Sequence, residues 1–459
     1  MIRIIKKMPN RMKVPLLYAA SLLPKNLIEN KEYKDYVKFL AESELWDSTQ
    51  ISEFQNMQLK LLIKHAYENV PYYTEVFNEY GIRVEDIQDT GDLKKLPLIN
   101  KEIIKNNKDK FIAKNFNFTQ LNKISTGGTT SGPMEFFDTH TTVNREMAFF
   151  HRIWNNYGYN DQLCLVLRGD AESSEKLYKY NPYKKLISIN TRNINDHKMK
   201  GIIEIINKYK PPYLQAYPSL IYLLSKYINE HDLSRKIPNF KAIFCSSEKM
   251  YDFQRDEIKR AFSTVVIDYY GHSERTALME YCPICKMYHV IPEYGVIEFL
   301  DKSGNSNDVE NHLTEIVGTS FNNYAFPLIR YQTFDIATMS GSNYKNKCNK
   351  PYVSIKEIDG RSGDFLITKD GKLYSPTILD FAIYYIPNFK EMQLVQHDYE
   401  QLEVLIVPSK SYKKDEGNRF VAELQKRIDT KMNIYITLVN QIERPSNQKH
   451  RFVVSKIKK

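Results

Sequence analysis

Cysteine is scarce in this sequence, with five residues among 459, an odd number. A disulfide framework needs an even and denser set, so the count excludes one and favours a reducing compartment, the cytoplasm. Helix-turn-helix, zinc-finger and RNA-recognition signatures are missing, and we therefore expect no nucleic-acid partner. Internal repeats and low-complexity segments are missing as well.

Apolar residues make up 42% of the chain and charged residues 26%, a composition typical of soluble globular proteins. The length suffices for two or three domains with a large core. The net charge of +10 comes from lysines spread along the chain, which favours anionic ligands or membrane surfaces as partners.

The chain opens with basic residues followed by an apolar stretch at 14–23. This stretch is too short to span a bilayer, and Pro24-Lys25 follows it without the small-residue pattern of a cleavage site. We expect a basic amphipathic helix that lies on the protein, with peripheral contact to the inner membrane surface as the alternative.

The spacing of apolar residues predicts an α/β protein. Residues 31–90 have helical spacing. From residue 96, short apolar runs alternate with helical patterns, an order that predicts a mostly parallel sheet with ligands at the carboxyl ends of its strands. The predicted strands lie at 163–167, 242–245 and 265–270, and the predicted helices at 141–155, 201–209, 219–230 and 252–262.

Beyond Gly295 the pattern becomes β-rich, with strands predicted at 296–300, 313–317 and 327–331. The last hundred residues combine strands at 392–397 and 402–407 with a helix at 418–432. We predict three regions: an N-terminal helical shell over 1–95, a core over 96–362, and a small α+β domain over 363–459. The boundary is placed at 361–364, where glycines flank charged residues.

The stretch at 125–133, Ser-Thr-Gly-Gly-Thr-Thr-Ser-Gly-Pro, combines adjacent glycines with hydroxyl side chains. Glycine lets backbone N–H groups turn toward a ligand, and serine and threonine add donors, so the stretch suits a polyphosphate. No Lys-Ser/Thr pair closes it and no helix follows at once, which excludes a Walker loop. A plain turn between strands is the alternative.

Cys282-Pro-Ile-Cys285 is half of a tetrahedral zinc site. His289 follows closely and Cys348 lies in the β-rich region, and these two are the candidates for the remaining ligands of a structural zinc ion. Buried free thiols are the alternative.

Seven short motifs stand in a fixed order, and this order resembles the adenylate-forming superfamily. They are Thr126-Gly-Gly-Thr-Thr-Ser-Gly-Pro, Tyr217-Pro-Ser219, Ser246-Ser-Glu248, Tyr270-Gly-His-Ser-Glu274, Arg330-Tyr-Gln-Thr-Phe-Asp335, Gly360-Arg361 and Lys449. With Trp46-Asp-Ser and His65-Ala-Tyr-Glu-Asn-Val-Pro-Tyr-Tyr ahead of them, the chain is similar to the phenylacetate–CoA ligase-like branch, which includes CapK-type capsular polysaccharide biosynthesis proteins. The resemblance runs from about residue 46 to the C-terminus.

The resemblance implies an enzyme that joins a carboxylate to the α-phosphate of ATP, releases pyrophosphate, and lets a nucleophile displace AMP. It implies a large N-terminal domain with mostly parallel sheets and a β-rich subdomain. It also implies a small C-terminal domain that rotates about a hinge near 361–364. Because an anion approaches a tetra-anion in the first step, neutralisation of charge should dominate the barrier.

The resemblance also implies roles for single residues. Glu274 would bind Mg²⁺, Asp335 the ribose hydroxyls, and Tyr270 would stack on adenine. Arg361 would contact ribose and phosphate, and Lys449 would approach the α-phosphate and the substrate carboxylate; Lys449, Glu274 and Arg361 are the predicted catalytic set. The predicted nucleotide-binding set is Ser125, Thr126, Gly127, Gly128, Thr129, Thr130, Ser246, Ser247, Glu248, Tyr270, Gly271, His272, Ser273, Glu274, Asp335 and Arg361.

These roles have structural alternatives. Glu274 and Asp335 read alone are ordinary surface acids, Tyr270 a core residue and Lys449 a solvated lysine. His272 would line the acyl pocket or serve the fold.

Three departures from the family pattern bear on activity. Ser131-Gly132 stands where relatives have Gly-Lys, Phe334 replaces the glycine of Thr-Gly-Asp, and Gln448 replaces the glycine before the lysine. A lost lysine removes one charge-assisted contact, worth ~1.5–3 kcal/mol, which lowers affinity without abolishing the chemistry. We therefore expect an active ligase whose acceptor is coenzyme A or an amine or amino-sugar. The alternatives are a degenerate nucleotide-binding scaffold of a polysaccharide assembly, and a transferase that uses no ATP.

Overall fold

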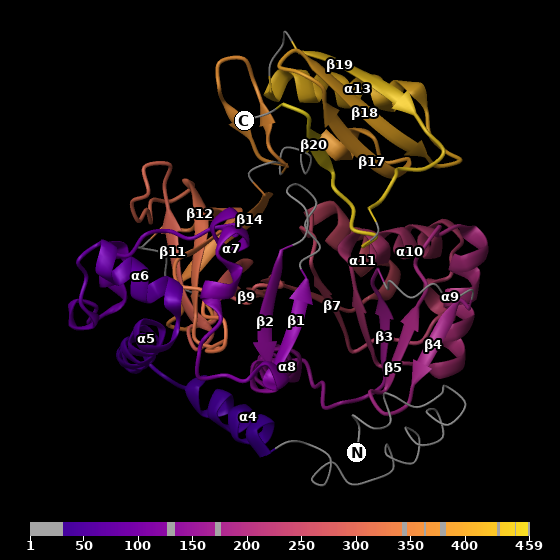
Figure 1. Ribbon diagram of the computed structural model, residues 1–459. Coiled ribbons are helices and arrows are strands. Elements are labelled where there is room, and N and C mark those ends of the chain that lie inside the picture. The colour runs from indigo at the N-terminus through magenta and orange to yellow at the C-terminus, as the bar shows by residue number, and fades with distance from the viewer. Residues whose placement is uncertain are drawn as a thin grey trace. The chain divides into compact units, whose positions relative to one another are not determined.

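The computed structural model describes residues 31–125, 134–169, 176–341, 347–361, 364–376, 382–428, 432–445 and 447–457 (Figure 1). The predicted N-terminal amphipathic helix and residues 126–133 of the glycine-rich stretch lie outside these ranges. The chain divides into two compact units. The first unit comprises Asp161–Asp268 and the described chain from Asp359 onward, and the second comprises the described residues up to Asn160 together with Tyr269–Ile358.

The first unit contains the parallel sheet that the alternating pattern predicts. Strands β3, β5, β6 and β7 run parallel, β4 is antiparallel at the edge, and the strand order is β8-β7-β6-β3-β5-β4. The elements are β3 (Cys164–Leu167), β4 (Tyr178–Asn181), β5 (Leu186–Ile189), α9 (Asp196–Tyr209), β6 (Tyr213–Ala216), α10 (Pro218–Glu230), η5 (Ser234–Lys236), β7 (Ala242–Ser246), α11 (Asp252–Phe262) and β8 (Val265–Gly271), which continues into the second unit.

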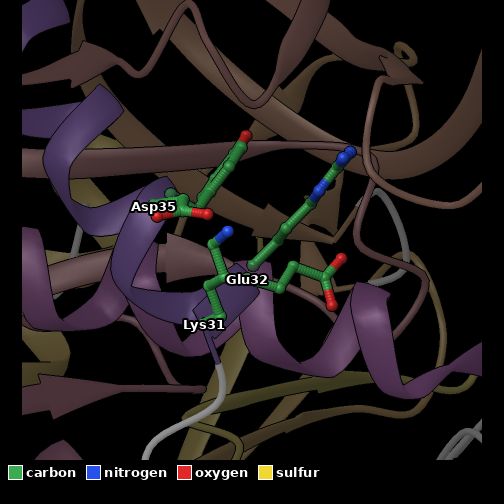
Figure 2. Close-up of a pocket in the computed structure, with 5 residues that line it drawn as sticks. Lys31, Glu32 and Asp35 are labelled. Atoms are coloured by element: carbon green, nitrogen blue, oxygen red, sulfur yellow. The ribbon is translucent and has the colours of Figure 1, made fainter. Parts of the chain in front are cut away.

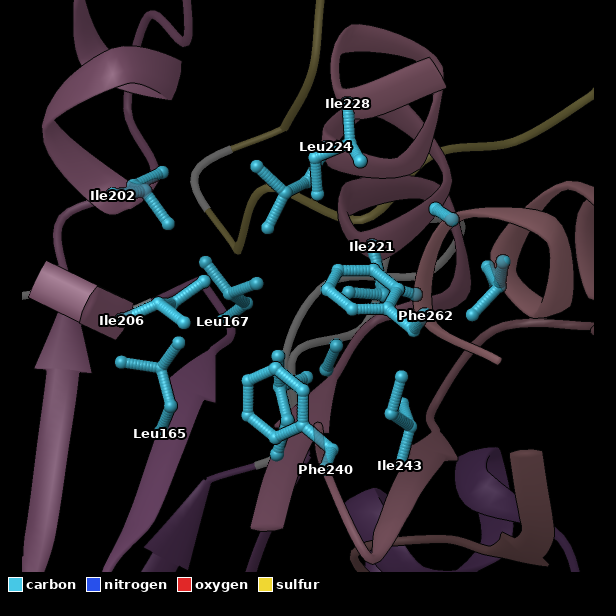
Figure 3. Packing of buried hydrophobic residues seen from close by; sticks show 14 of the residues in the cluster. Leu165, Leu167, Ile202, Ile206, Ile221, Leu224, Ile228, Phe240, Ile243 and Phe262 are labelled. Atoms are coloured by element: carbon cyan, nitrogen blue, oxygen red, sulfur yellow. The ribbon is translucent and has the colours of Figure 1, made fainter. Parts of the chain in front are cut away.

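Helices α9, α10 and α11 bury their apolar sides in the core of this sheet (Figure 3). In α9 the buried residues follow helical spacing, as Ile202, Ile205 and Ile206 show. The side chain of Asn195 accepts from the Lys198 amide and caps the helix start. Leu165 of β3 and Ile243 of β7 pack in the same core, which joins the helices to the strands of the sheet.

The chain beyond β14 adds a small sheet to the first unit. Its order is β19-β18-β17-β20, with β17 and β18 antiparallel and the two outer pairs parallel. The elements are β15 (Leu366–Ile367), β16 (Leu373–Tyr374), η7 (Ile383–Tyr385), β17 (Phe389–Gln396), β18 (Gln401–Pro408), α13 (Lys414–Arg427), β19 (Asn433–Leu438) and β20 (Val453–Ser455).

The second unit combines helices with an antiparallel sheet in the order β11-β12-β13-β14-β10-β9. The helical elements are α4 (Lys31–Ser43), α5 (Ser48–Asn69), α6 (Pro71–Glu79), η1 (Val84–Asp86), η2 (Thr90–Lys95), α7 (Lys101–Asn106), η3 (Lys108–Phe111), η4 (Phe118–Gln120) and α8 (His140–Asn155). The strands are β1 (Leu121–Ser125), β2 (Glu135–Thr139), β9 (Leu278–Cys282), β10 (Met287–Val290), β11 (Gly295–Leu300), β12 (Leu313–Ser320), β13 (Tyr331–Met339) and β14 (Ser354–Arg361), which ends in the first unit.

The predicted fold class, α/β with a β-rich part and an α+β C-terminal part, is confirmed. Two local predictions are wrong. Residues 327–331 are not a strand, because Arg330 has a φ of +53° and β13 begins only at Tyr331. The helix predicted at 418–432 is α13, which begins at Lys414 and ends at Arg427. The predicted domain boundaries stay a prediction.

Within the described ranges, no helix combines the length and the apolar character that a membrane span requires.

Candidate functional site

Two acids predicted to bind the nucleotide are held by neighbouring aromatic residues of the second unit. The Tyr270 hydroxyl donates to Asp335 Oδ2 over 2.7 Å, and the Tyr331 hydroxyl donates to Glu274 Oε1 over 3.2 Å. The His272 ring lies between these tyrosines, with ring centroids 5.9 Å from Tyr270 and 6.2 Å from Tyr331. The end of β8 and the start of β13 thus bring Glu274 and Asp335 into one polar cluster.

Glu274 is kept ionised by its surroundings. Its Oε2 lies 3.2 Å from His272 Nδ1, and Thr276 Oγ1 lies 3.1 Å from the other nitrogen of that ring. Burial opposes ionisation, but the hydrogen bonds from His272 and Tyr331 and the charge of His272 outweigh it and lower the pKa of Glu274 to about 2. A charged, hard oxygen at this place fits the magnesium role that the sequence predicts.

Asp335 is aimed by a β-bulge between β12 and β13. Gln332 faces Val317 and Ile336 faces Glu315, so three residues of β13 stand opposite Ile316 alone. Thr333 Oγ1 donates to the Ile316 carbonyl over 2.7 Å and accepts from the Asp335 amide over 3.1 Å.

The middle residue of the bulge, Phe334, has a φ of +59° and is 42% exposed. A left-handed backbone favours glycine, the residue that the family pattern has at this position.

The glycine-rich stretch begins where β1 ends. Ser125 is the last residue of β1 and pairs with Glu135 of β2, and the predicted ligands Thr126–Thr130 lie outside the described residues. Asp138 of β2 is fully buried and accepts from Asn122 Nδ2 over 3.0 Å and from the Arg275 guanidinium. Arg275 directly follows Glu274, so the hairpin that carries the stretch is tied to the segment that carries Glu274. Sequence reasoning missed this pair, whose only signal was a charge beside the motif.

Gly271 and Ser273, on either side of His272, also lie in the second unit, whereas the first unit holds Ser246, Ser247, Glu248, Arg361 and Lys449. Ser246 Oγ accepts from Arg168 over 2.9 Å, Ser247 has a φ of +74°, and Arg361 ends β14 with its side chain exposed. The Glu248 carboxylate accepts from Ser219 N over 2.9 Å. The Lys449 Nζ lies 5.9 Å from the centroid of the Tyr217 ring.

Three cysteines and one histidine converge at the turn between β9 and β10. The ligand atoms of Cys282, Cys285, His289 and Cys348 all lie within 4.8 Å of one another. Cys348 Sγ is 3.3 Å from His289 Nε2, and His289 Nδ1 is 2.8 Å from Ser354 Oγ. The four residues named from the sequence therefore form one cluster, while metal binding itself stays a prediction.

A surface pocket of about 590 Å³ also lies in the second unit (Figure 2). Its lining mixes both charge signs with one phenol: Lys31, Glu32, Asp35, Tyr36 and Arg145. None of the residues predicted to bind the nucleotide lines it, and we assign it no role.

The sequence of this chain is similar to that of several known proteins. Residues 366–456 match the CapK C-terminal domain family. Protein CapK of Staphylococcus aureus is 26% identical over 441 residues, which cover 93% of each chain. The phenylacetate-coenzyme A ligase of Pseudomonas putida is 24% identical over 414 residues, 84% of this chain and 88% of that protein.

The chain is therefore similar to protein CapK and to the phenylacetate-coenzyme A ligases. The resemblance predicted from the motifs is thereby confirmed, and these relatives agree with the predicted class of enzyme, an AMP-forming acid ligase. A solved structure of 2-hydroxyisobutyryl-CoA ligase in the postadenylation state has a TM-score of 0.70 to this chain. It is 16% identical and covers 91% of this chain and 92% of that one, and this likeness shows the shared fold.

Proposed function

We propose that this chain uses ATP to convert an organic carboxylic acid into an acyl-adenylate and then transfers the acyl group to an acceptor. The observation that carries the proposal is the polar cluster of the second unit. There Tyr270 holds Asp335 and Tyr331 holds an ionised Glu274, the two acids that the motif order assigns to ribose and magnesium. The relatives named as phenylacetate-coenzyme A ligases support the same reaction class.

In this proposal each side chain binds one part of the nucleotide or its Mg²⁺ ion. Glu274 supplies a hard oxygen to Mg²⁺, which when bound neutralises phosphate charge, and Asp335 accepts from the ribose hydroxyls. Lys449 supplies the cation for the α-phosphate as the carboxylate oxygen attacks and pyrophosphate leaves. Arg361 contacts ribose and phosphate.

The acceptor is coenzyme A or an amine or amino-sugar. The phenylacetate-coenzyme A ligases among the relatives support coenzyme A as the acceptor. A place in cell-surface polysaccharide synthesis, with an amine or sugar acceptor, rests on the motif resemblance alone. We place the activity in the cytoplasm, because five cysteines, an odd and small number, fit a reducing compartment.

Hydroxylamine trapping tests the adenylation step directly. Aromatic, fatty, hydroxy and amino acids are offered with ATP, and the hydroxamates and released pyrophosphate are measured. We expect at least one acid class to give both products, and Lys449→Ala to lower their formation by about a thousandfold. Lys456→Ala, a change at an exposed lysine of the same tail, serves as the control and should match the wild type.

A nucleotide-binding scaffold without ligase activity is the second candidate. Phe334 supports it, because a bulky ring in a left-handed position stands directly before the ribose acid. Tight ATP binding by calorimetry together with no hydroxamate from any acid would favour the scaffold. Absence of ATP binding would favour a transferase that uses no nucleotide.

We also propose that the four-residue cluster at the β9–β10 turn holds one structural zinc ion. Three sulfurs and one imidazole nitrogen are a donor set that zinc prefers, and tetrahedral coordination at about 2.3 Å puts sulfurs roughly 3.8 Å apart. The 4.8 Å span of the ligand atoms needs only a small contraction to reach this. Ser354 beside His289 Nδ1 fixes the ring so that Nε2 faces Cys348.

Zinc content of the purified protein tests this site. We expect one equivalent of zinc in the wild type and less than half an equivalent in Cys348→Ser. Cys164→Ser, which changes a buried cysteine of the first unit outside the cluster, should keep its zinc. A wild type without zinc after refolding with excess zinc would contradict the proposal.

A further inference from the structure

The predicted catalytic lysine sits on a short loop with an ordered set of contacts. We call residues 447–450 the lysine loop. The Asn447 side chain accepts from the Lys449 amide over 3.1 Å, and the His450 ring donates from Nε2 to the Met392 carbonyl over 2.9 Å. Gln448 between them has a φ of +59°. The loop is therefore folded on itself and fixed to β17 at one end.

Glu248 holds the other side of the lysine loop. Its Oε1 accepts from the His450 amide over 2.6 Å and from Ser219 Oγ over 3.1 Å, and its Oε2 accepts from the Ser219 amide over 2.9 Å. The carboxylate thus joins the start of α10 to the backbone next to Lys449. Removing a carboxylate even partly from water costs free energy unless donors satisfy it, so the three donors to the half-buried Glu248 favour this one arrangement.

Arg444 closes the same joint from the loop's N-terminal side. Its Nη1 donates to Ser219 Oγ over 3.0 Å and to the Gln448 carbonyl over 3.1 Å, and its Nη2 donates to Glu391 Oε2 over 2.9 Å. Ser219 is therefore contacted both by Glu248 and by the residue that braces the lysine loop.

Gly169 leaves no space between the loop after β3 and the lysine loop. A Cβ atom at residue 169 would lie 2.0 Å from the Asn447 carbonyl oxygen and 3.0 Å from the Gln448 Cβ. Its φ is outside the left-handed region, so the close approach of Asn447, and not backbone strain, requires glycine here.

From these contacts we infer that Gly169, Ser219 and Glu248 form a seat that positions the lysine loop and thereby Lys449. The catalytic consequence rests on the proposed function, whereas the seat itself rests on contacts within the first unit. This gives the Glu248 side chain a positioning role in place of the nucleotide contact predicted from its motif. All three residues act through the loop, so a loss of the seat should slow adenylation and leave ATP affinity unchanged.

Two variants separate the seat from general stability. Gly169→Ala adds one methyl group against Asn447. Glu248→Gln keeps the side-chain volume but replaces one acceptor oxygen with an NH₂ group, so that at least one of the three donors loses its acceptor. Glu416→Gln is the matched control, because this buried carboxylate accepts from Asn388 and is not bonded to the lysine loop. The readouts are amide hydrogen exchange of peptides that cover residues 447–452, the rate of acid-dependent pyrophosphate release, and the Kd of ATP.

We expect exchange in these peptides to rise at least tenfold in Gly169→Ala and less in Glu248→Gln, with no change in Glu416→Gln. Pyrophosphate release should fall by roughly 10–100-fold in the same order, because a displaced catalytic group loses about this much rate, while the Kd of ATP stays within about twofold.

Unchanged exchange in both variants would contradict the proposal that these residues hold the lysine loop. Raised exchange with an unchanged rate would overturn the role of the seat in positioning Lys449. If the wild type releases no pyrophosphate with any acid, the proposed function fails, and the exchange results alone decide whether the seat exists.

Discussion

Phe334 and Gln448 are among the residues whose backbone conformation disfavours a side chain. Phe334 and Gln448 each have a φ of +59°, and both stand where the family pattern has glycine. The sequence showed these departures but not their cost, because a motif states which residue is usual and not which φ the fold imposes. Both flank a predicted functional residue, Asp335 in one case and Lys449 in the other.

Replacing either residue by glycine should stabilise the protein. A left-handed conformation costs a residue with a side chain about 1–2 kcal/mol, and the greater freedom of glycine in the unfolded chain offsets about 0.5–1 kcal/mol of this. We expect Phe334→Gly and Gln448→Gly to raise the free energy of unfolding by up to about 1 kcal/mol in thermal denaturation. Asn311→Gly, at a φ of +63°, should change it less, because asparagine tolerates this region. A clear loss of stability in Phe334→Gly would show that the ring packs against the fold.

His450 should make stability depend on pH. Burial, with the charge of Arg444, lowers the pKa of His450 to about 3, so the folded protein holds this ring neutral while the unfolded chain protonates it near pH 6.5. The stabilisation is therefore complete above about pH 6.5 and is lost as the pH falls toward 3, by on the order of 2 kcal/mol at pH 5.

Urea unfolding of the wild type and of His450→Gln from pH 4.5 to 7.5 measures this dependence. The variant should show a flatter curve over that window, since glutamine does not titrate. Parallel curves for the two proteins would contradict the assignment of the depressed pKa to His450.

At the scale of elements, the spacing of apolar residues correctly predicted strands and helices that bury one continuous face. Helix α11 has the predicted bounds, and β8 ends at Gly271 as its apolar run indicates. The prediction failed where a partner strand decides the structure. The bulge at Thr333–Asp335 depends on the pairing of β13 with β12, and the ion pair of Arg275 with Asp138 joins residues 137 positions apart. The site acids were predictable from motif order, but the contacts that aim them were not.

Arg275 should be an anchor of the β1–β2 hairpin. Asp138 is fully buried, and Arg275 Nε also lies 3.9 Å from the carboxylate of Glu146. Arg275→Ala leaves buried carboxylates without their cation and should lower the free energy of unfolding by roughly 3–5 kcal/mol.

The double variant Arg275→Met, Asp138→Leu should recover most of that loss, because it removes the charges from both sides and keeps the volume. Chemical denaturation of the single and double variants measures the coupling. A loss in the double variant equal to the sum of the losses in the two single variants, Arg275→Met and Asp138→Leu, would show that the two charges do not interact.

At the scale of the whole chain, the CapK C-terminal domain docks in the first unit through aromatic rings. Phe253 of α11 lies 5.7 Å from Phe452 and 6.3 Å from Phe389, measured between ring centroids, and Tyr251 lies 4.8 Å from Phe452. Tyr222 of α10 completes this contact at 6.3 Å from Phe389. A hinge rotation near residues 361–364, which the family resemblance implies, has to separate these rings as well as the lysine loop from its seat.

Removing the central ring should therefore uncouple the C-terminal part from α10 and α11. Loss of a buried phenylalanine costs about 3–5 kcal/mol, and in Phe253→Ala this loss falls on the docking contact. We expect a separate, earlier transition in calorimetry and faster proteolysis between β14 and β15. Phe262→Ala removes a ring of similar burial from the core of the parallel sheet, where it packs on Phe240, and should lower the main transition without separating the two. If both variants unfold in a single transition, the rings do not form a separable docking contact, and the hinge rotation must move them as one body.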